Sequence, residues 1–217
     1  VFIEPEFDAS AQVAGGLVPS VIADAIKAYP AAKALILTYP NYYGMVANLG
    51  EIIETAHHHG LAVLVDEAHG VHFIAGSPFP PSAVSLGADI VVQSAHKTLP
   101  AMTMGAYLHY NEGRVSKEKL ELFLQMLQSS SPSYPIMASL DAARSYLGTL
   151  KKDELKELER EIRSFRRQVN DIPGLSVLPQ TGDPLKMVIR SSLGYSGFAL
   201  QSLLEEQGIF TELADEH

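Results

Sequence analysis

A strand, a helix and a second strand follow one another within about 30 residues early in the chain, and this unit limits the possible folds most. Residues 34–39 and 61–65 are apolar almost throughout. Between them, residues 46–59 have the apolar spacing of a helix, and Gly60 follows as a residue suited to ending it. Two strands joined in this way lie parallel with a right-handed crossover. Because both runs are continuously apolar, we expect a sheet covered on both faces.

The rest of the chain continues this pattern and then changes it. The sequence predicts further strands at 90–93 and 105–110 and helices at 19–29, 115–128, 136–147 and 151–170. Ile172-Pro173-Gly174 breaks the last helix. Beyond it, strands are expected at 175–178 and 186–189 and a helix at 197–207. We therefore predict an α/β fold with a mainly parallel sheet flanked by helices in residues 1–171, and the start of a small α+β domain in residues 172–217.

Composition favours small-molecule chemistry over nucleic-acid binding. Acidic residues outnumber basic ones 25 to 16, with a net charge of −9, whereas phosphate backbones are bound by Lys and Arg. The chain has no cysteine, which excludes disulfides and thiolate metal sites. We find no apolar segment near the roughly 20 residues that a bilayer span needs, and no basic-then-apolar leader. We expect a cytoplasmic protein with no membrane or nucleic-acid partner.

Two charged residues, Asp66 and Lys97, follow two of the predicted parallel strands. Open α/β sheets place their chemistry at this carboxyl edge. An ordinary surface lysine is the alternative interpretation of Lys97. However, both residues follow apolar runs expected to be buried, and a buried amine has the lowered pKa that reaction with a carbonyl requires. A buried Asp66 needs a cationic partner, and a pyridinium nitrogen would be one.

The residues around this pair resemble those of a known family, the pyridoxal-phosphate-dependent ornithine/lysine/arginine decarboxylases of the aspartate-aminotransferase fold type. The resemblance runs from about residue 4 to residue 150, and its two most specific blocks are Ser-x-His-Lys-Thr-Leu-Pro and Ser-Pro-Ser-Tyr-Pro. The matching segments are Val65-Asp66-Glu67-Ala68-His69-Gly70, Ala88-Asp89, Gln93-Ser94-Ala95-His96-Lys97-Thr98-Leu99-Pro100 and Ser131-Pro132-Ser133-Tyr134-Pro135-Ile136-Met137-Ala138-Ser139-Leu140-Asp141.

The resemblance implies roles for the residues at the end of the second strand. Lys97 is implied to be the Schiff-base lysine and Asp66 the partner of the pyridinium nitrogen. Ala68 is implied to pack against the ring face, and His69 to lie near the phenolic edge of the ring. The implied reaction is decarboxylation of arginine, lysine or ornithine to the corresponding amine, as in polyamine metabolism.

It also implies contacts beyond the ring. Ser94 and His96 are implied to contact the phosphate or the lysine adduct, and Lys97 or His96 to return a proton to Cα. Ser130 and Ser131 match a loop that reaches the cofactor of a neighbouring subunit, so a homodimer or higher homo-oligomer is expected. The family's phosphate-binding loop and ring-stacking residue are expected upstream of Val1. These 217 residues by themselves are therefore expected to lack a complete site.

Several alternatives compete with this interpretation. Asp-Glu-Ala-His at residues 66–69 is also a helicase motif, but no Gly-x-x-x-x-Gly-Lys-Ser/Thr phosphate loop precedes it. The same four residues occur in α-oxoamine synthases, and another enzyme of the fold type, such as an aminotransferase, is a further alternative. A catalytically silent oligomeric partner is a third, although it has no chemical need for Asp66 and Lys97. Metal binding by His57-His58-His59 or His69-x-x-His72 is disfavoured, because consecutive helical histidines cannot share one face; we predict no metal.

Two further features stay open between structure and function. Tyr39, Tyr42 and Tyr43 either pack against the sheet edge or line the site. Arg190 ends a predicted strand, where a substrate carboxylate is one conceivable partner.

Overall fold

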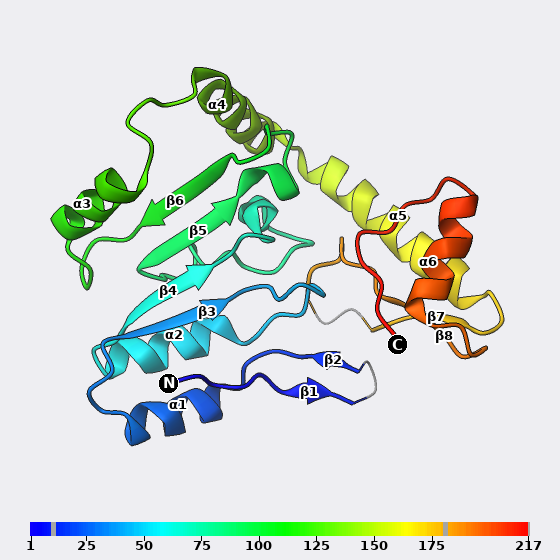
Figure 1. The fold of residues 1–217 in the computed structure, drawn as a ribbon, viewed down its shortest axis with the longest axis horizontal. Coiled ribbons are helices and arrows are strands. Elements are labelled where there is room, and N and C mark those ends of the chain that lie inside the picture. Colours follow the sequence, from blue (N-terminus) through cyan, green and yellow to red (C-terminus); the bar gives the residue numbers. More distant parts are fainter. Residues whose placement is uncertain (10–11, 180–181, 217) are drawn as a thin grey trace.

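The computed structural model describes residues 1–9, 12–179 and 182–216, and its largest sheet has four strands (Figure 1). The strands run in the order β3-β4-β5-β6. Each comes from one of the apolar runs in the sequence, with bounds within one residue of the prediction. They are β3 (Ala34–Thr38), β4 (Ala62–Asp66), β5 (Ile90–Ser94) and β6 (Ala106–Tyr110).

Three of these strands are parallel. β4 pairs in parallel with both β3 and β5, whereas β6 is antiparallel to β5. The predicted α/β class with a mainly parallel sheet is confirmed. The register places Thr38 beside Asp66 and Asp66 beside Val92, so the carboxyl ends of β3, β4 and β5 form one edge of the sheet. Side chains that follow these strands are therefore neighbours.

Helices α1 (Pro19–Ala28) and α2 (Leu49–His58) pack against each other and cover one face of the sheet (Figure 1). Ile22 of α1, Ile52 of α2 and Val63 of β4 are completely buried in this core. α2 starts later than the predicted residue 46, because Asn48 takes the N-cap position. The side-chain amide of Asn48 donates to the Glu51 carboxylate at 2.8 Å. The packing of this face stabilises the parallel unit.

The opposite face of the sheet is open in the part of the chain that the structure describes. Ile36 is 74% exposed, Val92 40% and Leu108 38%. Strand alternation sends these side chains away from α1 and α2, which lie together on the other face. The prediction of a sheet covered on both faces is therefore wrong for the described residues.

Short elements connect the sheet to its surroundings. A hairpin precedes α1, and a 3₁₀-helix follows each of β4 and β5 near the carboxyl edge of the sheet. The hairpin consists of β1 (Phe7–Asp8) and β2 (Val13–Ala14), and the 3₁₀-helices are η1 (Val71–Ala75) and η2 (Ala95–Lys97).

Three helices follow β6: α3 (Lys117–Leu127), α4 (Tyr134–Thr149) and α5 (Lys152–Asn170). In α5, Leu155, Ile162 and Val169 recur every seven residues and are buried, while charged residues fill the remaining surface. The predicted long helix with one face in solvent is confirmed. α3 differs, because none of its residues is buried.

The C-terminal elements form a separate small sheet with one helix. β7 (Leu175–Val177) pairs antiparallel with β8 (Ile189–Ser191). α6 (Gly197–Glu206) follows, with the Ser196 hydroxyl accepting from the Ala199 amide at its N-terminus. The division into domains at residues 171 and 172 stays a prediction. In the described ranges, no helix is both long enough and apolar enough to cross a bilayer.

Candidate active site

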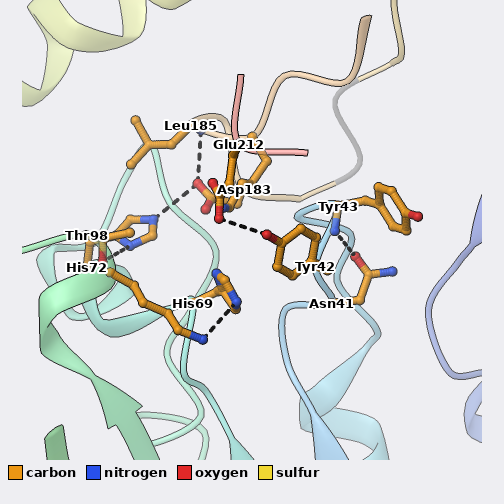
Figure 2. Close-up of polar contacts among 11 residues, drawn as sticks. Asn41, Tyr42, Tyr43, His69, His72, Thr98, Asp183, Leu185 and Glu212 are labelled. Carbon is orange, nitrogen blue, oxygen red and sulfur yellow. Dashed lines mark hydrogen bonds and ion pairs between the residues drawn. The ribbon is translucent and has the colours of Figure 1, made fainter. Parts of the chain in front are cut away.

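Lys97 lies at the carboxyl edge of the sheet, as the last residue of η2. Its Nζ is 3.0 Å from Nε2 of His69, which follows β4 (Figure 2). Two residues that the sequence assigned to one site are therefore in contact. Lys97 is exposed, however, so the predicted burial of its amine is wrong. The reason is that Ala95, not the lysine, fills the buried side of η2.

Asp66 and Glu67 point to opposite sides of the sheet because strand side chains alternate. Asp66 lies on the open face and is exposed, so its predicted burial is also wrong. Its Oδ1 accepts a hydrogen bond from the Ala68 amide at 3.0 Å, which bends the backbone at the strand end. Asp66 therefore presents a carboxylate at the same sheet edge as Lys97.

Glu67 is completely buried and anchors the loop that carries Asp66 and His69. Its carboxylate accepts from the Ser82 hydroxyl at 2.9 Å, from the Ala83 amide at 2.7 Å and from the Gln93 side-chain amide. Burial raises the pKa of Glu67, and these three donors act against that shift. No role was predicted for Glu67 from the sequence; its position one residue after Asp66, where strand alternation turns the side chain to the other face of the sheet, is the signal that could have suggested one.

His69 is 9% exposed and packs edge-on against Tyr42, with 5.1 Å between ring centroids. Burial lowers its pKa most, followed by the positive charges of Lys97 and Lys186. A neutral imidazole with a free Nε2 lone pair accepts a hydrogen bond from the Lys97 ammonium. Its Nδ1 is buried and has no hydrogen-bond partner in the described part of the chain.

Two charged residues from the C-terminal part of the chain complete this cluster. The Tyr42 hydroxyl donates to Glu212 at 3.0 Å, and Lys186 donates to the same carboxylate at 3.3 Å (Figure 2). The Lys186 ammonium also lies 5.7 Å from the centre of the Tyr42 ring. Burial raises the pKa of Glu212, but Lys186, the Tyr42 hydroxyl and His69 outweigh it, so that this pKa is lowered overall. Neither Lys186 nor Glu212 was predicted as a site residue. Lys186 was expected to begin a strand at 186–189, but β8 begins at Ile189 and Lys186 lies in the loop before it. Glu212 lies in a loop after α6, where no periodic pattern marks a function.

The other predicted site residues near the sheet lie on the segments that carry Asp66 and Lys97. Ala68 is half-buried beside Asp66, and Ser94 ends β5 immediately before η2. The His96 ring donates from Nδ1 to the Gly105 carbonyl at 3.1 Å, so it is tied to the strand that follows. Their predicted contacts with a cofactor stay predictions.

Ser130 and Ser131 lie in the exposed connection between α3 and α4, far along the chain from η2 (Figure 1). The Ser131 amide donates to the Ser129 hydroxyl at 3.3 Å. The structure does not bring these serines into the cluster around Lys97. Their predicted role in a neighbouring subunit is compatible with this outward position.

The three tyrosines have different environments. Tyr39 is buried, edge-on to Phe73, and its hydroxyl donates to the Pro81 carbonyl at 3.0 Å. Burial, with a smaller contribution from Glu67, raises the pKa of Tyr39 to about 12. Tyr43 packs against the small cluster formed by Val13 and Met45. Of the three, Tyr42 is therefore the one that lines the candidate site.

The remaining candidates have structural partners. His57 contacts Asp89 at 2.8 Å, and His59 donates to the Thr55 carbonyl at 2.9 Å at the end of α2. No group of three or more possible metal ligands occurs among the residues described. Arg190 donates to Gln12 at 3.1 Å, near the hairpin β1–β2.

Comparisons with known proteins identify relatives of this chain. Residues 1–181 match the family described as Orn/Lys/Arg decarboxylase, major domain. The chain is 50% identical to the protein YaaO of Bacillus subtilis, over 100% of the chain and 47% of the relative. It is 36% identical to an arginine decarboxylase of the same organism, over 99% of the chain and 46% of the relative.

The fold matches a solved enzyme over the whole chain. The constitutive lysine decarboxylase of Escherichia coli superimposes with a TM-score of 0.74 at 19% identity, covering 100% of this chain and 38% of that one. The family and its structural neighbours are pyridoxal-phosphate-dependent enzymes. The chain spans about half the length of the curated relatives that it matches. By the match over residues 1–181, the chain belongs to the Orn/Lys/Arg decarboxylase family.

Proposed function

We propose that this protein decarboxylates a basic amino acid, arginine, lysine or ornithine, with pyridoxal phosphate held covalently by Lys97. The observation that carries the proposal is the 3.0 Å contact between Lys97 and His69 at the sheet edge where Asp66 ends β4. Three residues of the family pattern thus lie at one edge of the sheet, which supports the proposal. The relatives named arginine decarboxylase, at 36% identity, support a basic amino acid as the substrate.

The side chains at this edge fit the cofactor. Lys97 offers an exposed primary amine, and Asp66 offers an exposed carboxylate. His69 has a buried Nδ1 that lacks a partner within the described residues. When bound, pyridoxal phosphate supplies an electron sink that accepts the electrons released as carbon dioxide leaves.

Each side chain then has a distinct role. Lys97 Nζ would hold the cofactor and, as a free amine, would carry the proton that the substrate Cα receives. Asp66 would supply the negative charge that favours a protonated ring nitrogen. His69, kept neutral by burial and by the neighbouring lysines, accepts a hydrogen bond from Lys97 and so orients the amine.

Glu212 is the group that we assign to the distal cation of the substrate. Its carboxylate bonds Tyr42, which packs against His69, and Lys186, whose charge acts on His69, and its lowered pKa keeps it ionised. A guanidinium or ammonium group replaces Lys186 at this carboxylate more readily than a neutral group does, because charge-assisted hydrogen bonds are the stronger ones. This assignment favours basic over neutral amino acids.

We further propose a homodimer in which α3 contributes to the interface. Exposed apolar side chains cover this helix, and a second copy of the chain would remove them from water. Ser130 and Ser131, in the adjoining connection, would then face the partner's site. These apolar residues are Leu122, Phe123, Met126 and Leu127, which are 53%, 55%, 67% and 83% exposed. Sedimentation of the intact protein and of Phe123→Glu tests this, because a dimer that survives the substitution unchanged contradicts the interface.

The tether is tested by borohydride trapping. The intact protein is incubated with pyridoxal phosphate and borohydride, and the modified peptide is identified by mass spectrometry. We expect one modified lysine, Lys97, and none in Lys97→Ala. Lys27→Ala is the matched control, because Lys27 is exposed on α1 and pairs only with Asp24 in the described part of the chain. An unchanged label in Lys97→Ala contradicts the proposal.

The reaction is tested by carbon dioxide and amine release from arginine, lysine and ornithine. Glu212→Gln is expected to raise KM for the preferred amino acid more than it lowers kcat, because the residue binds the substrate away from the reacting carbon. Trapping at Lys97 without amine release from any of the three amino acids refutes the decarboxylase assignment and favours an α-oxoamine synthase or an aminotransferase.

A further inference from the structure

A chain of hydrogen bonds behind Lys97 links the large sheet to the segment that carries Lys186. The His72 ring lies between Thr98 and Asp183, with Nδ1 3.2 Å from Thr98 Oγ1 and Nε2 3.1 Å from Asp183 Oδ1 (Figure 2). Thr98 directly follows Lys97 in the sequence, and Asp183 is 111 residues from His72. These hydrogen bonds therefore join parts of the protein that are far apart in the sequence.

Burial holds the hydrogen-bonded residues Thr98, His72 and Asp183 in one arrangement. The Asp183 side chain is 0% exposed and that of His72 is 5% exposed. The His72 ring is also held edge-on between Phe73 and Phe79, with centroid distances of 4.8 and 4.7 Å. Because an ionised carboxylate only accepts, His72 donates from Nε2 to Asp183. In the neutral ring, Nδ1 then accepts from the Thr98 hydroxyl.

Asp183 is also bound to the loop and the segment that build the rest of the site. Its amide donates to the Gly44 carbonyl at 2.8 Å, next to the Tyr42 loop. Its Oδ1 accepts from the Leu185 amide at 3.0 Å, and its carbonyl accepts from the Lys186 amide at 3.2 Å. Moving Asp183 therefore moves Lys186 and, through it, Glu212.

We propose that Thr98, His72 and Asp183 are positioning residues, which hold Lys97 in register with Lys186 and Glu212. None of the three needs to touch the substrate or the cofactor. The inference rests on the proposed function, and it adds a physical link between the lysine that reacts and the pair that recognises the substrate. Breaking the link lets η2 and residues 182–186 shift independently, and small displacements in a site have large effects on rate.

The test is a double-mutant cycle on the intact protein with Thr98→Val and Asp183→Asn. These two side chains bond opposite nitrogens of His72, so their energetic coupling has to pass through the ring. We expect each substitution to slow formation of the borohydride-trapped Lys97 adduct and to raise KM. The rate of the double variant is expected to differ by about fivefold or more from the product of the two single effects. In a His72→Phe background the two effects become additive or disappear.

Two further variants test the two hydrogen bonds of His72 separately. His72→Gln keeps a polar group near the Nε2 position, within reach of Asp183, whereas His72→Asn keeps one near the Nδ1 position, within reach of Thr98. Because the proposal requires both contacts, both variants are expected to slow adduct formation. Wild-type rates in either variant overturn the proposal.

Adduct formation per folded molecule is a readout that a purely structural role does not change. Folded protein is quantified by urea unfolding, and Asp171→Asn, an exposed acid at the end of α5, is the matched control. Additive effects in the wild-type background, or rates within twofold of wild type, refute the positioning role. Wild-type protein that forms no Lys97 adduct refutes the proposed function instead, so the two failures are distinguishable.

Discussion

Replacing Glu67 tests whether the buried carboxylate holds the loop that carries Asp66 and His69. Glu67→Leu keeps much of the side-chain volume but removes the acceptor for three donors. All three donors are buried, but the Ser82 hydroxyl can rotate, whereas the Ala83 amide and the Gln93 side chain have no comparable alternative among the contacts described. Glu67→Gln is milder, because its Oε1 still accepts from the Ala83 amide.

The magnitude follows from the donors that lose their partner. Each unpaired buried donor costs about 1–3 kcal/mol, so two cost about 2–6 kcal/mol. The apolar side chain of leucine and the removal of a buried charge offset about 1–2 kcal/mol of this. We therefore expect Glu67→Leu to lower the free energy of unfolding by about 1–4 kcal/mol, and Glu67→Gln by about 1–2 kcal/mol, where one donor is lost.

Urea unfolding followed by circular dichroism measures this loss, with Glu54→Leu on the exposed face of α2 as the control, expected within about 0.5 kcal/mol of wild type. The pH dependence adds a second check. Burial raises the pKa of Glu67 above its ordinary value of 4.5, so the folded state holds this proton more tightly than the unfolded state. Stability from this group is present below pH 4.5 and is lost as the pH rises through the folded pKa. Glu67→Gln lacks that decline. A Glu67→Leu protein as stable as wild type refutes the anchoring role.

Three further predictions follow from single contacts. Lys97→Ala raises the pKa of His69 toward its ordinary value, because one of the positive charges that lower this pKa is removed. NMR titration of the ring measures the change, and an unchanged pKa contradicts the contact. Gly182→Ala drives a Cβ into a backbone carbonyl of the neighbouring loop and costs about 1–3 kcal/mol in urea unfolding, whereas Gly148→Ala in α4 meets no atom within 4 Å and costs nothing. Asp89→Ala removes a 2% exposed carboxylate that binds a histidine and a backbone amide, and lowers the free energy of unfolding by about 3–5 kcal/mol. A loss under about 1 kcal/mol refutes its structural role.

Local patterns in the sequence determined most of the elements. Apolar runs predicted all four strands of the large sheet, and the helical spacing predicted α5 to within one residue. The positions of Asp66 and Lys97 after two parallel strands predicted that they share one edge of the sheet. These predictions succeed because strand and helix periodicity, and the geometry of a parallel crossover, are local properties of the chain.

The direction of β6 and the open face were decided by tertiary structure. An apolar run has the same pattern in a parallel and an antiparallel strand, so the sequence does not distinguish the two. It also does not say which face a helix covers. Because α1 and α2 share one face, Asp66 is exposed and Glu67, one residue later, is completely buried.

The sequence by itself determined that a lysine and an aspartate lie at the same edge of a parallel sheet, together with the family pattern around them. Only the tertiary structure decided what surrounds them. Lys186, Glu212 and Asp183 lie in loops, and the strand predicted at 186–189 gave Lys186 no role in the site. Backbone pairing at Gly44 and the buried contact with His72 bring residues 182–186 back to the sheet, and Lys186 in turn binds Glu212. Contacts between residues more than one hundred positions apart depend on the packing of the whole chain, which no local pattern encodes.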